Sequence, residues 1–172
     1  MGKKDEDFKI PPVSTLIGST LPNFFRVLAM GKPDLRYIPK LLLTLIVILI
    51  STPFQIYEYL YFRSKVKKFH FRECPIFIIG HWRSGTTHLH NLLCKDPNHG
   101  FLTTYQSVFP NNLKSKWIFK SFMKWKIPET RPADNVKLSP DFPQEEEFAL
   151  ANMTVSSFYH FFYFPSKNDL LY

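Results

Sequence analysis

The chain has 172 residues, 45% of them hydrophobic and 17% aromatic, and a formal net charge of +8 at pH 7. This apolar content excludes an intrinsically disordered chain, and two cysteines are too few for a disulfide scaffold. The length suits one domain and is short for a complete nucleotide-binding enzyme. The positive charge favours an anionic partner, such as a nucleotide, a polyanion or an anionic membrane. We expect no nucleic acid partner, because no nucleic-acid-binding motif accompanies the charge.

The N-terminal residues begin with a charged head, residues 3–7, that is too acidic for the start of a signal peptide. Phe24, Phe25, Val27 and Leu28 then predict a short amphipathic helix. We identify no chemistry in this stretch.

Residues 41–50 form an almost entirely apolar run, and Pro53, Gln55 and Glu58 interrupt its extension. A spanning helix needs about 20 apolar residues, which disfavours a single-pass span. Cations flank the run on both sides and fit a helix embedded in one leaflet of an anionic membrane. A buried core helix is the alternative. We assign residues 1–68 to an N-terminal helical segment and expect a membrane-associated or cytoplasmic location.

A strand, a glycine-bounded turn and a helix follow each other in the middle of the chain. Residues 76–79 are β-branched or aromatic and predict a buried strand, which Gly80 ends. Gly85 lies five residues later, and leucines at helical spacing come after it. These leucines are Leu89, Leu92 and Leu93. Together the three elements predict a phosphate cradle, because loop N–H groups and a helix N-terminus attract an anion to one spot.

The turn keeps the glycine spacing of the ATP- and GTP-binding loop but not its lysine. Thr86 stands in the lysine position, Thr87 stands where a hydroxyl would bind Mg²⁺, and Arg83 provides a cation inside the loop. A loop of this kind suits a group with fewer phosphates and a terminal oxyanion.

Arg83-Ser84-Gly85-Thr86-Thr87 resembles the Arg/Lys-x-Gly-Thr-Thr loop of the sulfotransferases that use 3′-phosphoadenosine 5′-phosphosulfate (PAPS). The longer segment of residues 80–89 resembles the bacterial-type branch of that family. The resemblance implies an α/β fold, with a P-loop-type parallel sheet flanked by helices. Residues 69–172 would form its N-terminal part, preceded by the apolar helix.

The resemblance also implies an activity, the transfer of a sulfuryl group from PAPS to a hydroxyl acceptor without a metal. The acceptor class stays open between a carbohydrate, a lipid and a small alcohol. Ser84, Gly85, Thr86 and Thr87 would hold the 5′-phosphosulfate. Arg83 would neutralise charge on the bridging oxygen as the S–O bond breaks.

Residues 101–104 predict a second short strand, most simply parallel to the first in a βαβ unit. Residues 105–110 would then lie near the carboxyl ends of the strands, where open α/β sheets bind ligands. Several sulfotransferase branches have an acidic base in this region, but Thr104-Tyr105-Gln106 contains no acid. We therefore look for the base elsewhere.

Residues 114–126 predict a helix with one apolar face, formed by Ile118, Phe119, Phe122 and Met123. A stripe of lysines lies beside that face, at Lys116, Lys120 and Lys124. The stripe is either a solvated surface or a basic wall beside an anionic ligand.

Residues 128–143 contain four prolines and predict an extended loop. Asp141 and Pro143 then predict a helix start, followed by Glu145, Glu146 and Glu147. These acids either complement the helix dipole or include the base, Glu145 or Glu147, that accepts the acceptor's proton. The string from Asp141 to Phe148 resembles a recurring acidic segment of bacterial-type sulfotransferases.

The second half of the family's donor site has no convincing counterpart. Arg131 and Ser139 have a spacing reminiscent of the 3′-phosphate ligands, but the prolines around them discourage the needed strand and helix. We reject this pair and expect an incomplete fragment that is not a competent sulfotransferase as given. Two alternatives remain, a P-loop nucleotide kinase or NTPase and a non-catalytic, membrane-attached binding protein.

Overall fold

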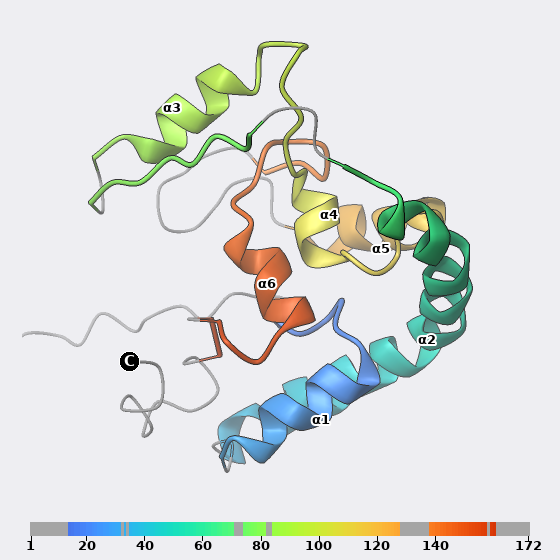
Figure 1. Ribbon diagram of the computed structural model, residues 1–172. Helices are drawn as coiled ribbons and strands as arrows, with labels where there is room; N and C mark the ends of the chain where they lie inside the picture. The colour runs from blue at the N-terminus through green and yellow to red at the C-terminus, as the bar shows by residue number, and fades with distance from the viewer. Residues whose placement is uncertain are drawn as a thin grey trace, which may run out of the picture.

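A computed structural model describes residues 14–31, 33, 35–70, 74–81, 84–127, 138–157 and 159–160. Its elements (Figure 1) are α1 (Leu21–Ala29), the 3₁₀ helix η1 (Leu35–Tyr37), α2 (Ile38–Lys67), α3 (Thr86–Leu93), α4 (Thr104–Val108), α5 (Lys116–Lys126) and α6 (Glu147–Met153). These described residues form no strand, and their β pairing is one isolated antiparallel bridge between Thr103 and Pro143. The predicted parallel sheet is therefore not observed in this part of the chain.

The amphipathic helix predicted near the N-terminus is present as α1. The Thr20 side chain caps it by accepting a hydrogen bond from the backbone of the first turn. Phe24 and Val27 are buried, whereas Phe25 is 55% exposed. The buried pair forms the first hydrophobic cluster with Leu16 and, from α2, Leu41 and Ile48.

The apolar run of residues 41–50 lies within a much longer helix, α2, which continues through Pro53 as far as Lys67. Pro53, Gln55 and Glu58 therefore interrupt the apolar run but not the helix. An internal proline removes one backbone donor and bends a helix without necessarily ending it, and α2 is visibly bent (Figure 1). By length and composition α2 could cross a membrane, a property that core helices of soluble proteins share.

Gln55 and Glu58 hold α2 to the rest of the protein. The Gln55 amide donates a hydrogen bond to the Ser19 carbonyl at 3.1 Å. The Glu58 carboxylate is 4% exposed and accepts hydrogen bonds from the Leu113 N–H, the Ser115 N–H and the Ser115 hydroxyl. Hydrogen bonds to a charged group contribute about 1.5–3 kcal/mol each. They compensate for removing the Glu58 charge from water.

The second hydrophobic cluster joins α4 and α5 to α2. Phe119 and Met123 of α5 are buried, as the helical spacing predicts. The ring of Phe119 lies 5.3 Å from that of Phe109 and 5.8 Å from that of Phe54 in α2, measured between centroids. Residues on both sides of the predicted boundary at residue 68 therefore share this core.

Asn152 of α6 lies at the centre of a buried polar network. Its side-chain oxygen accepts a hydrogen bond from the Gly18 N–H at 3.0 Å. Its amide nitrogen donates to the Phe148 carbonyl at 3.0 Å and to the Ser107 carbonyl at 3.4 Å. This one side chain therefore ties the segment before α1 to α4 and α6.

The strand predicted at residues 101–104 is wrong, because helix α4 begins at Thr104. Thr103 and Gln106 form a capping box, in which the Thr103 hydroxyl accepts from the Gln106 N–H at 3.3 Å. The Gln106 side chain in turn accepts from the Thr103 N–H at 2.9 Å. This reciprocal pair fixes a helix start locally, whereas a strand would need a distant partner.

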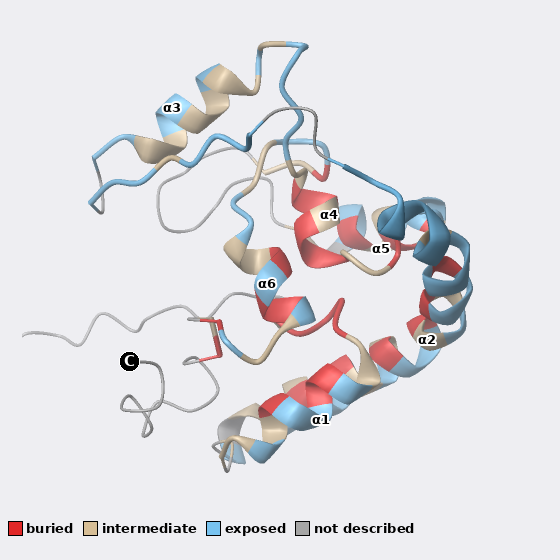
Figure 2. Ribbon diagram, viewed as in Figure 1, coloured by how far each residue is buried: buried red, intermediate tan, exposed pale blue. Residues whose placement is uncertain are grey.

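The described residues between 74 and 101, which we call the arm, lie apart from the α1–α2 pair (Figures 1 and 2). The buried strand predicted at residues 76–79 is not found there. Ile76 is 60% exposed, Phe77 77% and Ile79 93%. A strand is stable when neighbouring strands take up its backbone hydrogen bonds, and the described part of the chain offers none.

Candidate functional site

The loop before α3 is shaped by its two glycines. A Cβ atom at Gly80 would lie 2.6 Å from the Thr86 methyl group and 2.7 Å from the Ser84 hydroxyl, so the turn closes tightly over this position. Gly85 has φ +91°, in the left-handed region that other residues rarely adopt. The Ser84 N–H donates to the His81 carbonyl at 3.1 Å. These contacts fold the loop back on itself directly before the helix.

Helix α3 begins immediately after this turn. Gly85 is its N-cap residue, and the Gly85 carbonyl accepts the first helical hydrogen bond, from the Leu89 N–H at 3.0 Å. Thr86 and Thr87 occupy the first turn, where backbone N–H groups have no intrahelical acceptor. Such N–H groups and the helix dipole favour an anion. The hydroxyls of the two threonines lie beside the same helix end.

Glu145 approaches this helix from a distant part of the chain. The Thr87 hydroxyl donates a hydrogen bond to the Glu145 carboxylate at 3.4 Å. The two residues lie at the edge of a cleft of about 380 Å³ between α3 and the segment before α6. The cleft is lined by Thr87, His90, Asn91, Cys94, Lys95, Phe101, Thr104, Leu138, Phe142, Pro143, Gln144 and Glu145. Its walls therefore combine hydroxyl, amide and carboxylate groups with two phenylalanine rings.

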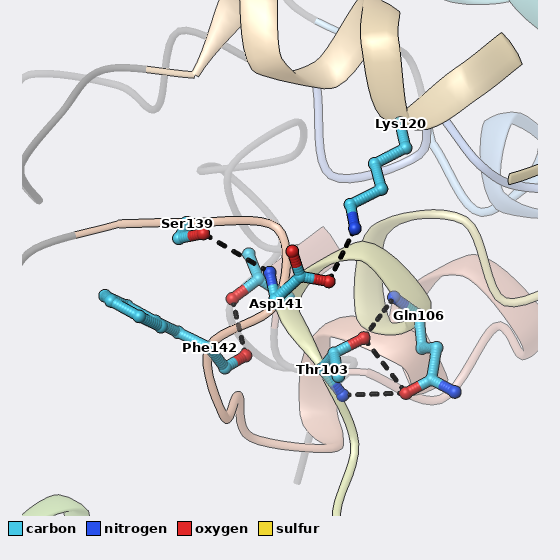
Figure 3. A network of polar contacts seen from close by, with 7 residues as sticks. Thr103, Gln106, Lys120, Ser139, Asp141 and Phe142 are labelled. Carbon is cyan, nitrogen blue, oxygen red and sulfur yellow. Dashed lines mark hydrogen bonds and ion pairs between the residues drawn. The ribbon is translucent and has the colours of Figure 1, made fainter. Parts of the chain in front are cut away.

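The segment that carries Glu145 is fixed to α4 and α5 (Figure 3). The Phe142 carbonyl accepts hydrogen bonds from the Thr104 N–H at 2.8 Å and from the Thr104 hydroxyl at 3.0 Å. The Asp141 carboxylate forms an ion pair with the Lys120 ammonium at 2.6 Å. One lysine of the predicted stripe thus holds this wall of the cleft in place.

The structure separates the two candidate bases. Glu147 begins α6, and its carboxylate accepts a hydrogen bond from the Ser157 hydroxyl at 2.8 Å. Glu145 is exposed and faces Thr87 across the cleft edge. The prediction that Asp141 caps this helix is wrong, because Glu146 is the N-cap residue and Asp141 is paired with α5.

Comparisons with known proteins identify this loop–helix unit. A model of the sulfotransferase family matches residues 75–172, more than half of the chain. The chain belongs to the sulfotransferase family. This membership implies a P-loop-type α/β fold, although the described residues of the chain form no strand. It also favours the sulfotransferase prediction over the nucleotide kinase alternative.

The chain is 39% identical over 94 residues to omega-hydroxy-beta-dihydromenaquinone-9 sulfotransferase Stf3 of Mycobacterium bovis. The protein of the same name from Mycobacterium tuberculosis matches equally well. Each match covers 54% of this chain and 24% of the relative, so the matched segment spans about a quarter of the relatives' length. No solved structure matches the chain significantly.

The predicted donor-site residues of this sulfotransferase chain are brought together only in part. Ser84 and Gly85 are exposed in the turn, and Thr86 and Thr87 are half-buried in α3. Arg83 lies outside the described residues. So does Arg131, while the Ser139 hydroxyl accepts a hydrogen bond from the Asp141 N–H at 3.5 Å.

Sequence reasoning missed the second face of α3. His90, Asn91, Cys94 and Lys95 follow Thr87 at helical spacing and line the cleft. The His90 ring lies 3.5 Å from the Cys94 sulfur, and partial burial raises the pKa of the Cys94 thiol. The leucines of α3 lie at the predicted helical spacing, and none of the residues of this helix is buried. The spacing of these polar residues was the available signal.

Proposed function

We propose that this segment supplies the 5′-phosphosulfate-binding part and the general base of a PAPS-dependent sulfotransferase. The observation that carries the proposal is the contact between Thr87, in the first turn behind the glycine loop, and Glu145. It places an anion-binding helix end within reach of a carboxylate. A sulfuryl transfer site needs both, one for the donor and one for the acceptor's proton.

The residues of the loop fit the donor's anionic end. Side chains would crowd the turn at Gly80, whereas its absent Cβ leaves room for backbone to close around an oxyanion. The backbone N–H groups of Gly85, Thr86 and Thr87 and the hydroxyls of Ser84 and Thr86 would hold the 5′-phosphosulfate, and the Thr87 hydroxyl would turn to it from Glu145. Arg83 would place its guanidinium beside the bridging oxygen, where negative charge grows as the S–O bond breaks. PAPS, when bound, supplies the sulfuryl group and needs no metal for this step.

Glu145 is the better candidate for the base. Its carboxylate stands at the cleft edge, where it can accept the proton of an acceptor hydroxyl as the new S–O bond forms. Glu147 is already bonded to Ser157, which supports a structural role at the start of α6. The same cleft supports a role for His90 and Lys95 in contacting the acceptor or donor.

We propose that the acceptor is an alcohol whose hydroxyl is attached to a large apolar group. Phe101 and Phe142 line the cleft next to Glu145, and they would pack against apolar atoms beside the reacting hydroxyl. The relatives are named for a hydroxylated menaquinone, an acceptor of this class. We also propose that the protein works at a membrane surface, because α2 is long and apolar enough to enter a bilayer.

The test combines transfer and binding. Radiolabelled sulfate transfer from PAPS is measured on an active enzyme that contains this segment, with long-chain alcohols and with sugars as acceptors. Adenosine 3′,5′-bisphosphate is titrated into the same enzyme by calorimetry. Thr87→Val should weaken nucleotide binding, whereas Thr52→Val, a matched change on α2, should not. Nucleotide binding without transfer to any alcohol would favour the non-catalytic alternative. A requirement for Mg²⁺ would contradict the proposal.

A further inference from the structure

Helix α2 turns its polar side toward the protein. Its buried residues alternate at spacings of three and four, so they form one stripe along the helix. This stripe consists of Leu41, Thr44, Ile48, Ser51, Gln55 and Glu58. Most of these residues are polar. Gln55 and Glu58 form hydrogen bonds to Ser19 and Ser115 outside the helix, whereas the Thr44 and Ser51 hydroxyls donate to carbonyls of α2 itself. In a surface helix of a soluble protein the buried stripe is the apolar one.

The opposite side of α2, which we call the outward face, carries apolar residues that are exposed to solvent. Exposed residues of this helix are pale blue in Figure 2. Each residue of the outward face is more than half exposed. They are Leu42, Leu43, Ile46, Leu49, Ile50, Ile56 and Leu60. A continuous row of this length is a surface that prefers an apolar partner to water.

The C-terminal half of α2 adds aromatic and cationic groups to this row. The Lys114 ammonium lies 3.5 Å from the centre of the Tyr61 ring and 5.4 Å from that of Tyr57. The Lys65 ammonium lies 4.3 Å from the Tyr61 ring centre and donates to the Tyr61 hydroxyl at 3.0 Å. Tyrosines and lysines at the end of an apolar stretch are typical of the boundary between acyl chains and lipid headgroups.

We propose that the outward face of α2 lies in one leaflet of an anionic lipid membrane. The aliphatic residues between 42 and 50 contact acyl chains, and the cluster around Tyr61 and Lys114 lies among the headgroups. A membrane-spanning orientation does not fit, because α1 packs along the same half of α2 and carries an exposed arginine, Arg26. An exposed arginine in the acyl region is costly.

The charge of the protein favours a lipid membrane over a second copy of the chain as the partner of the outward face. Lys40, Lys65 and Lys114 lie at the two ends of the row, and the chain carries a net charge of +8. Two copies joined through this face would bring these cations together. An anionic membrane instead neutralises them, with each lysine near the surface worth about a fivefold change in binding.

The experiment measures flotation of the purified chain with phosphatidylcholine vesicles that contain or lack phosphatidylglycerol. The variant Ile46→Gln with Leu49→Gln should bind both vesicle types about 10- to 100-fold more weakly. The matched control, Leu150→Gln with Met153→Gln, changes two exposed apolar residues of α6 and should bind like the unmodified chain. Lys65→Gln with Lys114→Gln should weaken binding to the anionic vesicles alone, by about 30-fold.

Unchanged vesicle binding by the Ile46 and Leu49 variant would overturn the proposal, as would an equal loss in the α6 control. Analytical sedimentation of each variant measures its oligomeric state and so tests whether a second copy of the chain covers the outward face instead. A dimer that the α2 variant alone dissociates, with no flotation of the unmodified chain, would assign the face to a second copy. Vesicle binding needs no nucleotide, so its failure would leave the proposed sulfuryl transfer untouched, and the reverse also holds.

Discussion

The helical body, formed by α1, α2, α4, α5 and α6, and the arm differ in how they are stabilised. The body has two hydrophobic clusters and a buried polar network around Asn152. None of the described residues from 74 to 101 is buried, although this arm contains the glycine loop and α3. The comparison indicates that the two regions serve different purposes. Changes in the arm and at the cleft edge should affect chemistry, and changes in the body should affect stability.

The largest effect is expected at the cleft edge, with Glu145→Gln. If Glu145 is the base, the variant should lose about 10²–10⁴ in transfer rate, because no group then takes the acceptor's proton. Nucleotide affinity and melting temperature should stay nearly constant, since the Glu145 side chain is exposed. Steady-state kinetics and a thermal melt of the same preparation check both parts.

Glu147→Gln provides the control for that experiment. This change weakens the bond from the Ser157 hydroxyl and removes a charge from the first turn of α6. A loss of about 0.3–1 kcal/mol in stability with a normal rate is expected. If the rate fell with Glu147→Gln and not with Glu145→Gln, the assignment of the base would be reversed.

The second effect concerns the loop of the arm. Arg83→Ala should lower the transfer rate of the active enzyme about 10²–10³-fold, the usual loss when one transition-state charge contact is removed. Arg83→Lys should recover part of that rate, because a point charge remains but the planar fork is lost. Normal turnover by the alanine variant would exclude the proposed role. Stability should not change in either variant.

The local elements of both regions could be predicted from sequence. The helical spacing of Phe119 and Met123 predicted α5 and its buried face, and the two glycines predicted the turn before α3. The capping box of Thr103 and Gln106 was also a local signal for a helix start. It was overlooked because residues 101–104 were expected to form the second strand of a βαβ unit. Local hydrogen bonds and side-chain spacing determine such elements, so a sequence contains the information directly.

The long-range features could not be predicted in this way. Helix α2 continues through Pro53, and beyond it Gln55 and Glu58 bind Ser19 and Ser115, which lie far away in sequence. The contact between Thr87 and Glu145 likewise joins residues 58 positions apart. The strand prediction at residues 76–79 failed for the related reason that strands depend on distant partners.

The third effect concerns the body. Asn152→Ala leaves the Gly18 N–H buried without its acceptor and should cost about 1–3 kcal/mol of unfolding free energy. Asn111→Ala is the matched control, because the Asn111 amide is half-buried and makes one 3.2 Å bond to the Gly18 carbonyl. It should cost less than 1 kcal/mol. Denaturant titration of both variants measures the difference, and an equal loss would contradict the central place of Asn152.

A smaller, pH-dependent effect is expected from His160, which is also buried in the body. Burial lowers the pKa of His160, and the Thr154 carbonyl and the Glu147 charge oppose this only in part. The unfolded chain therefore takes up a proton below about pH 6.5, the ordinary histidine value, while the folded chain does not. Stability should be full above that pH and fall below it, by at most about 1.4 kcal/mol per pH unit. His160→Gln should flatten this part of the stability curve, and an unchanged slope would show that other groups cause it.

The last prediction tests the comparison directly, and its smallest effect is expected in the arm. Ile79 of the arm is 93% exposed, whereas Ile48 of α2 is fully buried. The same substitution at the two positions should therefore give opposite results. Ile48→Ser should cost about 2–5 kcal/mol, because it creates a cavity and buries a hydroxyl. Ile79→Ser should stay within about 0.5 kcal/mol of the unmodified chain, as is usual for exposed sites. Chemical denaturation followed by circular dichroism measures both. If Ile79→Ser destabilised the chain as strongly as Ile48→Ser, the side chain at position 79 would be packed in solution. The strand expected at residues 76–79 would then have found partners, and the contrast between the two regions would disappear.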